Sequence, residues 1–142
     1  MPVDIHTPEA LAVFIARIFL GLLFFFQGFD AVFRIRVKGV IEEIREPLAQ
    51  KGVPGFFITT GAWFTSWAEL VGGILLVFGW LKSYAFCLLG ADLIMASVAF
   101  GIIKPMWDMQ FAFPRLALLL FLLVTPAGWD IYSLDHLIRN LN

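Results

Sequence analysis

Four ionisable residues lie inside long apolar stretches of this sequence: Arg17, Glu69, Asp92 and Arg115. A charged side chain near the centre of a bilayer costs about 2.5–3.5 kcal/mol on insertion scales. Such residues therefore face the protein interior, where they pair with one another or mark a functional site. With a rise of about 1.5 Å per helical residue, the four lie roughly 10–20 Å from the membrane side that carries both chain ends. We therefore expect one interior charge network of two cations and two anions.

Three roles for this network stay open at the level of the sequence. The charges can tie the helices together, because a neutral quartet is the least costly way to hold four ionised groups in lipid. They can surround the polar head of a quinone, a lipid or a similar ligand. They can also form part of a proton path. None of the four residues is assigned to catalysis.

The elements that position these charges are predicted to be helices, because a membrane span needs about 20 mostly apolar residues. The link Lys82-Ser83 is very short, so the two spans that it joins must run antiparallel. The sequence thus predicts an all-α membrane protein with four transmembrane helices in an antiparallel bundle, forming a single domain over residues 1–142. The four predicted spans cover about residues 10–33, 57–80, 84–103 and 113–126.

An amphipathic segment lies between the first two spans. Apolar residues recur at helical spacing from Val37 to Leu48, and charged residues lie opposite them. This pattern is typical of a helix in the membrane interface, which we predict over about residues 36–50. Gly39 and Pro47 weaken the helix, so one or two short pieces are expected.

Small residues flank the charges on their predicted helices. Arg17 shares a helical stripe with glycines in the first span, and both carboxylates lie among small residues in the second and third spans. Small residues let neighbouring helices approach closely in lipid, so we expect these stripes to form the helix contacts. The stripes are Gly21, Phe24 and Gly28 with Arg17; Ala62, Thr65, Gly72, Gly73 and Leu76 with Glu69; and Ala85, Leu88, Ala96 and Ala99 with Asp92.

Composition points to a membrane protein and excludes several kinds of site. The chain is 61% hydrophobic, whereas soluble domains contain about 45–50% apolar residues. A net charge of −1 gives no basic surface for nucleic acid. A single cysteine, Cys87, excludes an internal disulfide and a thiolate metal cluster, and we expect it to be buried. His6 and His136 lie outside the spans, so we expect surface histidines and no metal site, with a haem held between them as the alternative.

Several motifs, in their order along the chain, resemble the DoxX family of small four-span bacterial membrane proteins. The resemblance extends over nearly the whole chain, although relatives often have Lys after the glycine that ends span one, where this sequence has Phe29 after Gly28. It implies a four-helix bundle and an association with membrane redox chemistry, because relatives include a subunit linked to quinone-dependent sulfur oxidation. It implies no catalytic residues. The motifs are Arg17-x3-Gly21, Gly52-Val53-Pro54, Glu69-x2-Gly72-Gly73 followed by Gly79, and Gly128-x4-Ser133-Leu134-Asp135.

Two functions are predicted. The first is a non-catalytic integral subunit or accessory protein of a larger membrane complex associated with redox chemistry. The second is a quinone-binding oxidoreductase component that uses the interior charge network. The first is favoured because electrons would need a cofactor from a partner. The predicted partners are the lipid bilayer, other membrane subunits and a second copy of the chain, and the candidate ligands are quinone or lipid.

The distribution of basic residues predicts the orientation in a bacterial cytoplasmic (inner) membrane. Basic residues concentrate on the cytoplasmic side of membrane proteins, which here places the first and third loops inside and both chain ends in the periplasm. The first apolar run is read as a membrane span and not as a cleavable signal peptide. The basic residues of the two sides are Arg34, Arg36, Lys38, Arg45, Lys51 and Lys104, against Lys82 and Arg139.

Overall fold

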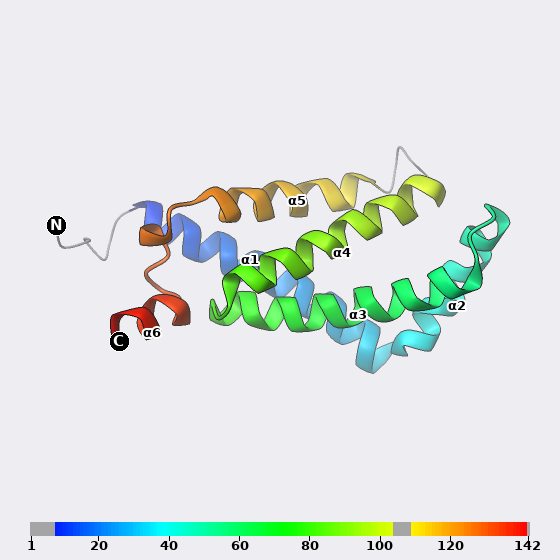
Figure 1. The fold of residues 1–142 in the computed structure, drawn as a ribbon, viewed down its shortest axis with the longest axis horizontal. Helices are drawn as coiled ribbons and strands as arrows, with labels where there is room; N and C mark the ends of the chain where they lie inside the picture. The colour runs from blue at the N-terminus through cyan, green and yellow to red at the C-terminus, as the bar shows by residue number, and fades with distance from the viewer. Residues whose placement is uncertain (1–7, 104–108, 142) are drawn as a thin grey trace.

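The computed structural model of this chain describes residues 8–103 and 109–141, and the regular elements in both ranges are all helical (Figure 1). This confirms the predicted all-α class. The elements in chain order are α1 (Pro8–Phe29), the π-helical turn η1 (Asp30–Arg34), α2 (Arg36–Gln50), α3 (Gly55–Phe78), α4 (Lys82–Ile103), α5 (Met109–Val124), the 3₁₀ turn η2 (Ala127–Trp129) and α6 (Leu134–Leu141).

Three helical stretches are long and apolar enough to cross a membrane: Pro8–Arg34, Gly55–Phe78 and Lys82–Ile103. They correspond to the first three predicted spans. Helix α5 has 16 residues and rises about 24 Å, which is less than the hydrocarbon thickness of about 30 Å. It packs beside α1 and α4 (Figure 1), but the fourth span and the antiparallel four-helix bundle stay predictions.

Helices α1 and α3 run antiparallel and touch through their backbones. A Cβ atom added to Gly28 would overlap the backbone of Leu70, and one added to Gly73 would overlap the backbone of Phe25. Both glycines belong to the small-residue stripes, so these stripes do form the helix contact, as close packing in lipid requires. The hydrophobic core continues from this contact to α4 and α5. Its buried members are Val13, Leu20, Phe24, Leu76, Leu89, Leu93, Leu119 and Leu122.

The predicted interfacial segment forms one continuous helix, α2, which runs through both Gly39 and Pro47. Its apolar face is covered by protein: Val37 and Ile41 are buried against Ala62 of α3. The helix itself is therefore confirmed over the predicted residues, whereas the expectation of short pieces was wrong. Its position in the membrane interface stays a prediction.

Helix α4 turns much of its apolar surface outwards. Ala85, Leu89 and Asp92 face the interior, while Ile94 and Val98 are exposed. Cys87 is also exposed, so the expectation that it is buried was wrong. The reason is its position on α4, two residues from the inward-facing Ala85 and Leu89 and therefore on another side of the helix.

Candidate functional site

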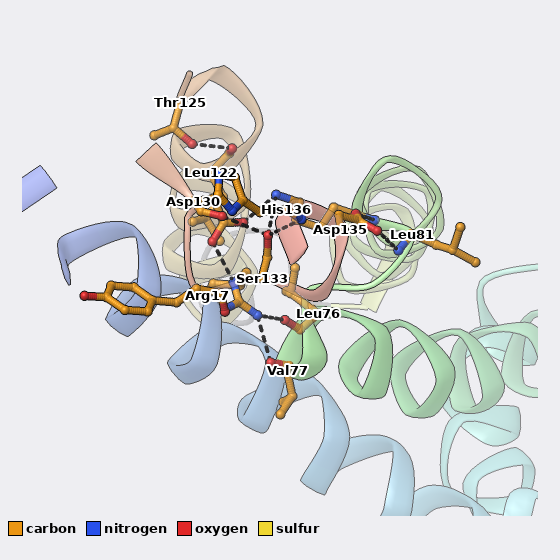
Figure 2. Close-up of polar contacts among 12 residues, drawn as sticks. Arg17, Leu76, Val77, Leu81, Leu122, Thr125, Asp130, Ser133, Asp135 and His136 are labelled. Atoms are coloured by element: carbon orange, nitrogen blue, oxygen red, sulfur yellow. Dashed lines mark hydrogen bonds and ion pairs between the residues drawn. The ribbon is translucent and has the colours of Figure 1, made fainter. Parts of the chain in front are cut away.

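Arg17 lies in a polar cluster at the end of the molecule where α1 begins and α3 ends (Figure 2). Its side chain is 1% exposed. Nε donates to Asp130 Oδ1 at 3.2 Å, and Nη1 donates to the carbonyl oxygens of Leu76 and Val77, each at 2.8 Å. Nη2 donates to the carbonyl oxygen of Tyr132 at 2.9 Å. One guanidinium therefore joins α1, the end of α3 and the C-terminal segment.

The end of α3 is built to receive this guanidinium. The last carbonyl groups of a helix lack partners within the helix and carry partial negative charge, and Arg17 bonds two of them. The helix stops at Gly79, which has a φ of 65°. A Cβ atom there would lie 2.8 Å from Nη1 of Arg17 and 2.6 Å from Cβ of Ser133. Gly79 is therefore needed both for the left-handed turn and for space.

Asp130 forms ion pairs with two cations, Arg17 and Lys82. Lys82 Nζ donates to Asp130 Oδ2 at 2.6 Å and to Ser133 Oγ at 3.3 Å. The Ser133 hydroxyl in turn donates to the carbonyl oxygen of Asp130 at 2.8 Å. The carboxylate is nearly buried, with 7% of its side chain exposed. We call Arg17, Asp130 and Lys82 the Arg17 cluster; it contains two cations and one carboxylate.

Asp135 ties the C-terminal segment to the turn between α3 and α4. Its carboxylate accepts hydrogen bonds from the backbone N–H groups of Leu81 at 2.9 Å and Lys82 at 3.0 Å (Figure 2). Its own N–H donates to the carbonyl oxygen of Gly79 at 3.0 Å. A carboxylate at this place stabilises the start of α4, because helix N-termini carry unpaired N–H groups and partial positive charge.

Glu69 and Asp92 form a second polar site in the interior of the protein. Glu69 lies on α3 and is 4% exposed, and Asp92 lies on α4 and is 1% exposed. Both carboxyl groups are close enough to Arg115 of α5 for an electrostatic interaction, although no ion pair joins them among the described residues. Asp92 Oδ1 is buried and has no hydrogen-bond partner among the described residues. We call Glu69, Asp92 and Arg115 the acidic centre.

Arg115 connects the acidic centre to α1. Its Nη1 donates to Gln27 Oε1 at 2.5 Å, and its guanidinium lies 5.9 Å from the ring centre of Phe24. The side chain is half-buried, and Gln27 is exposed. Three helices thus contribute to the centre itself, and a fourth contacts it through Gln27 and Phe24.

The structure places Arg17 apart from the other three predicted network residues. Its acceptors on α3, Leu76 and Val77, follow Glu69 by about two helical turns, or roughly 10 Å. No ion pair joins Arg17 to Glu69 or Asp92 within the described part of the chain. The two sites also differ in charge. The Arg17 cluster has an excess cation, and the acidic centre has an excess carboxyl group.

Sequence reasoning missed Asp130, Lys82 and Asp135. A signal for the first two was present, because Trp80 and Trp129 are predicted to mark span ends on the same side of the membrane and each has a charged residue one or two positions further on. The described residues contain no group of three or more possible metal ligands. The haem alternative involves His6, which lies outside the described residues; His136 Nδ1 is 3.2 Å from Asn140 Nδ2.

Comparison with protein families gives a match over most of the chain. The family model described as DoxX matches residues 12–102, which cover α1 from its second turn to near the end of α4. Arg17, Glu69 and Asp92 lie inside the matched region, whereas Arg115 and Asp130 follow it. No curated protein and no solved structure matches the chain significantly.

Proposed function

This chain belongs to the DoxX family, and from that premise we propose that it is a non-catalytic integral subunit or accessory protein of a larger membrane complex associated with redox chemistry. The resemblance to this family implies an association with membrane redox chemistry, and three helices have the length and hydropathy of membrane spans. The chain has one cysteine and two histidines, so electrons reach this subunit through a cofactor that a partner holds. The membrane is the bacterial cytoplasmic membrane.

The acidic centre is the observation that carries this proposal beyond a packing role. Buried polar groups are nearly always hydrogen-bonded, yet Asp92 Oδ1 lacks a partner among the described residues. The centre also contains two carboxyl groups and one guanidinium, so it is neutral only when it holds a proton or a compensating ligand group. A site that merely tied helices together would balance its charges and satisfy its acceptors. The acidic centre therefore handles a proton or a polar ligand for the complex.

A quinone-binding component is the second candidate, and the same centre favours it. Reduction of a quinone requires protons at its two carbonyl oxygens. Carboxyl groups supply such protons, and a guanidinium and an amide donate hydrogen bonds to carbonyl oxygens. Glu69, Asp92, Arg115 and Gln27, which come from α3, α4, α5 and α1, offer these groups. In this case the electrons still come from a partner, and this chain supplies the binding site and the protons.

Purification in mild detergent tests the first proposal. The full-length protein is isolated from its own host membranes, copurifying proteins are identified by mass spectrometry, and quinones are extracted and separated by chromatography. A redox enzyme that copurifies in constant proportion supports the subunit role. A protein that is isolated alone, although its cells retain membrane redox activity that depends on it, contradicts that role.

Two neutral variants test the second candidate. Asp92→Asn and Glu69→Gln each remove charge from a site with excess negative charge, so we expect their melting temperatures to be no lower than that of the parent. We expect bound quinone and quinone-linked activity of the complex to fall. Asp30→Asn is the matched control, because Asp30 forms an ion pair with Arg34 in which both side chains are largely exposed. Unchanged quinone content and activity in both variants would contradict quinone binding at this centre.

A further inference from the structure

A cleft of about 190 Å³ opens beside the Arg17 cluster, between the beginning of α4, the end of α5 and the C-terminal segment. One part of its lining is charged and includes Lys82, Asp135 and Arg139. The other part is apolar and includes Phe86 and Leu123. A cleft with these two kinds of wall suits an amphipathic ligand that has a charged head and a hydrocarbon portion.

The charged wall of this cleft favours an anion. Three cations and two carboxylates line it: Arg17, Lys82 and Arg139, with Asp130 and Asp135. Asp130 is shared between Arg17 and Lys82, and Asp135 is engaged by the first N–H groups of α4. Arg139 forms no ion pair with any described residue. The lining therefore carries one excess positive charge.

Donors remain free for a ligand in this lining. A lysine ammonium has three N–H groups, and two acceptors, Asp130 and Ser133, contact that of Lys82. Arg139 is exposed on α6 and presents a planar fork of donors that matches a phosphate group. Arg17 is not counted among the donors available to a ligand, because its guanidinium already donates to four protein acceptors.

The cleft lies at the end of the bundle where the chain passes from membrane to water. Trp80 and Trp129 are at this end, and tryptophan is enriched at membrane interfaces. Helix α6 is amphipathic: Leu137, Ile138 and Leu141 are exposed, while Asp135 and Arg139 turn towards the cleft. A helix of this kind lies along the membrane surface. The cleft therefore opens at the depth of lipid head groups.

We propose that this cleft binds the phosphate group of an anionic phospholipid through Lys82 and Arg139, with the upper part of the acyl chains against Phe86 and Leu123. The apolar face of α6 then lies in the same lipid leaflet. This site is separate from the acidic centre, and the inference does not depend on the proposed redox function.

Native mass spectrometry of the full-length protein tests this assignment. The protein is exchanged into detergent that contains equal amounts of phosphatidylglycerol, which is anionic, and phosphatidylcholine, which has no net charge. We expect preferential retention of phosphatidylglycerol. Arg139→Gln and Lys82→Gln should each lower that retention about fivefold, the effect expected for one basic side chain near an anionic membrane surface. Arg45→Gln, at an exposed position of α2, is the matched control and should retain as much as the parent.

Three outcomes would overturn the proposal. Equal retention of the two lipids would show that the head-group charge is not recognised. Parental retention in Arg139→Gln, an exposed substitution that leaves the fold intact, would show that the lipid binds elsewhere. Displacement of phosphatidylglycerol by an equal concentration of free glycerol phosphate would show a site for soluble anions and not for lipid.

Discussion

Arg17 is held by partners from the end of α3 and from the C-terminal segment, and Asp130 is the one that carries a compensating charge. Asp130 also compensates Lys82. Loss of this carboxylate would leave two cations near each other in a mostly buried site. Its contribution to stability is therefore larger than that of an ordinary surface ion pair.

Replacing Asp130 with Asn should destabilise the protein strongly. Removing one partner of a buried ion pair costs about 3–5 kcal/mol, so we expect a clearly lower melting temperature in detergent. The control is Asp30→Asn, which breaks the exposed pair with Arg34 and should cost no more than about 1 kcal/mol. The double variant Arg17→Gln with Asp130→Asn should lose less stability than the two single variants added together. Additive losses would contradict the coupling.

The burial of Arg17, Glu69 and Asp92 could be predicted from the sequence, because each lies in a span among small or apolar residues. Their partners could not. Side chains on a helix tilt towards its N-terminus, and α1 and α3 are antiparallel. Arg17 on α1 therefore reaches towards the end of the molecule, and Glu69 on α3 tilts the other way. The depth in the membrane that is estimated from the rise per residue refers to backbone positions. It therefore places Arg17 and Glu69 closer together than their charged groups are.

At the scale of elements, the contact between α1 and α3 depends on glycines. Gly73→Ala should lower the melting temperature, because the added methyl group would overlap the backbone of Phe25. Overpacking of this kind costs about 1–3 kcal/mol. Gly101→Ala in α4 is the matched control: a Cβ atom there meets nothing within 4 Å, so the variant should be as stable as the parent or slightly more stable. A Gly73→Ala protein with parental stability would contradict the backbone contact.

Helix α2 should detach from α3 when charges enter its apolar face. Ile41 is buried and Ile44 packs beside it, so replacing both with Glu places carboxylates against Ala62. We expect faster cleavage of residues 36–50 by protease in proteoliposomes. Arg45→Glu, on the exposed face of the same helix, should leave the cleavage rate unchanged. Equal protection of the double variant and the parent would show that this face does not hold the helix.

The formation of α2 as one helix shows how tertiary contacts modify a sequence pattern. Its amphipathic period predicted helix over residues 36–50, and its Gly39 and Pro47 predicted a break. The contact of Val37 and Ile41 with Ala62 of α3 fixes one face of the helix over its first half, where Gly39 lies. Packing of this kind supplies most of the stability of protein helices, and it depends on residues that are distant in sequence.

At the scale of the whole molecule, the orientation in the membrane can be tested with reporter fusions. Six basic residues lie on the predicted side of the first and third loops, against Lys82 and Arg139 on the side of both chain ends. Since basic residues favour the cytoplasmic side, we expect alkaline phosphatase fused after Asn142 to be active in the periplasm. A fluorescent protein that folds in the cytoplasm should stay dark at the same position. An inactive phosphatase together with a fluorescent reporter at this position would show the opposite orientation.

The link between Arg17 and Asp130 has a consequence for biogenesis. The two residues are separated by 113 positions, which a ribosome covers in roughly 6–23 s at about 5–20 residues per second. During that time Arg17 of the first helix has been synthesised and its partner carboxylate, Asp130, has not. The charge of Arg17 is therefore not compensated by Asp130 until the last segment of the chain has been synthesised. A chain that stops before Asp130 keeps Arg17 without this carboxylate.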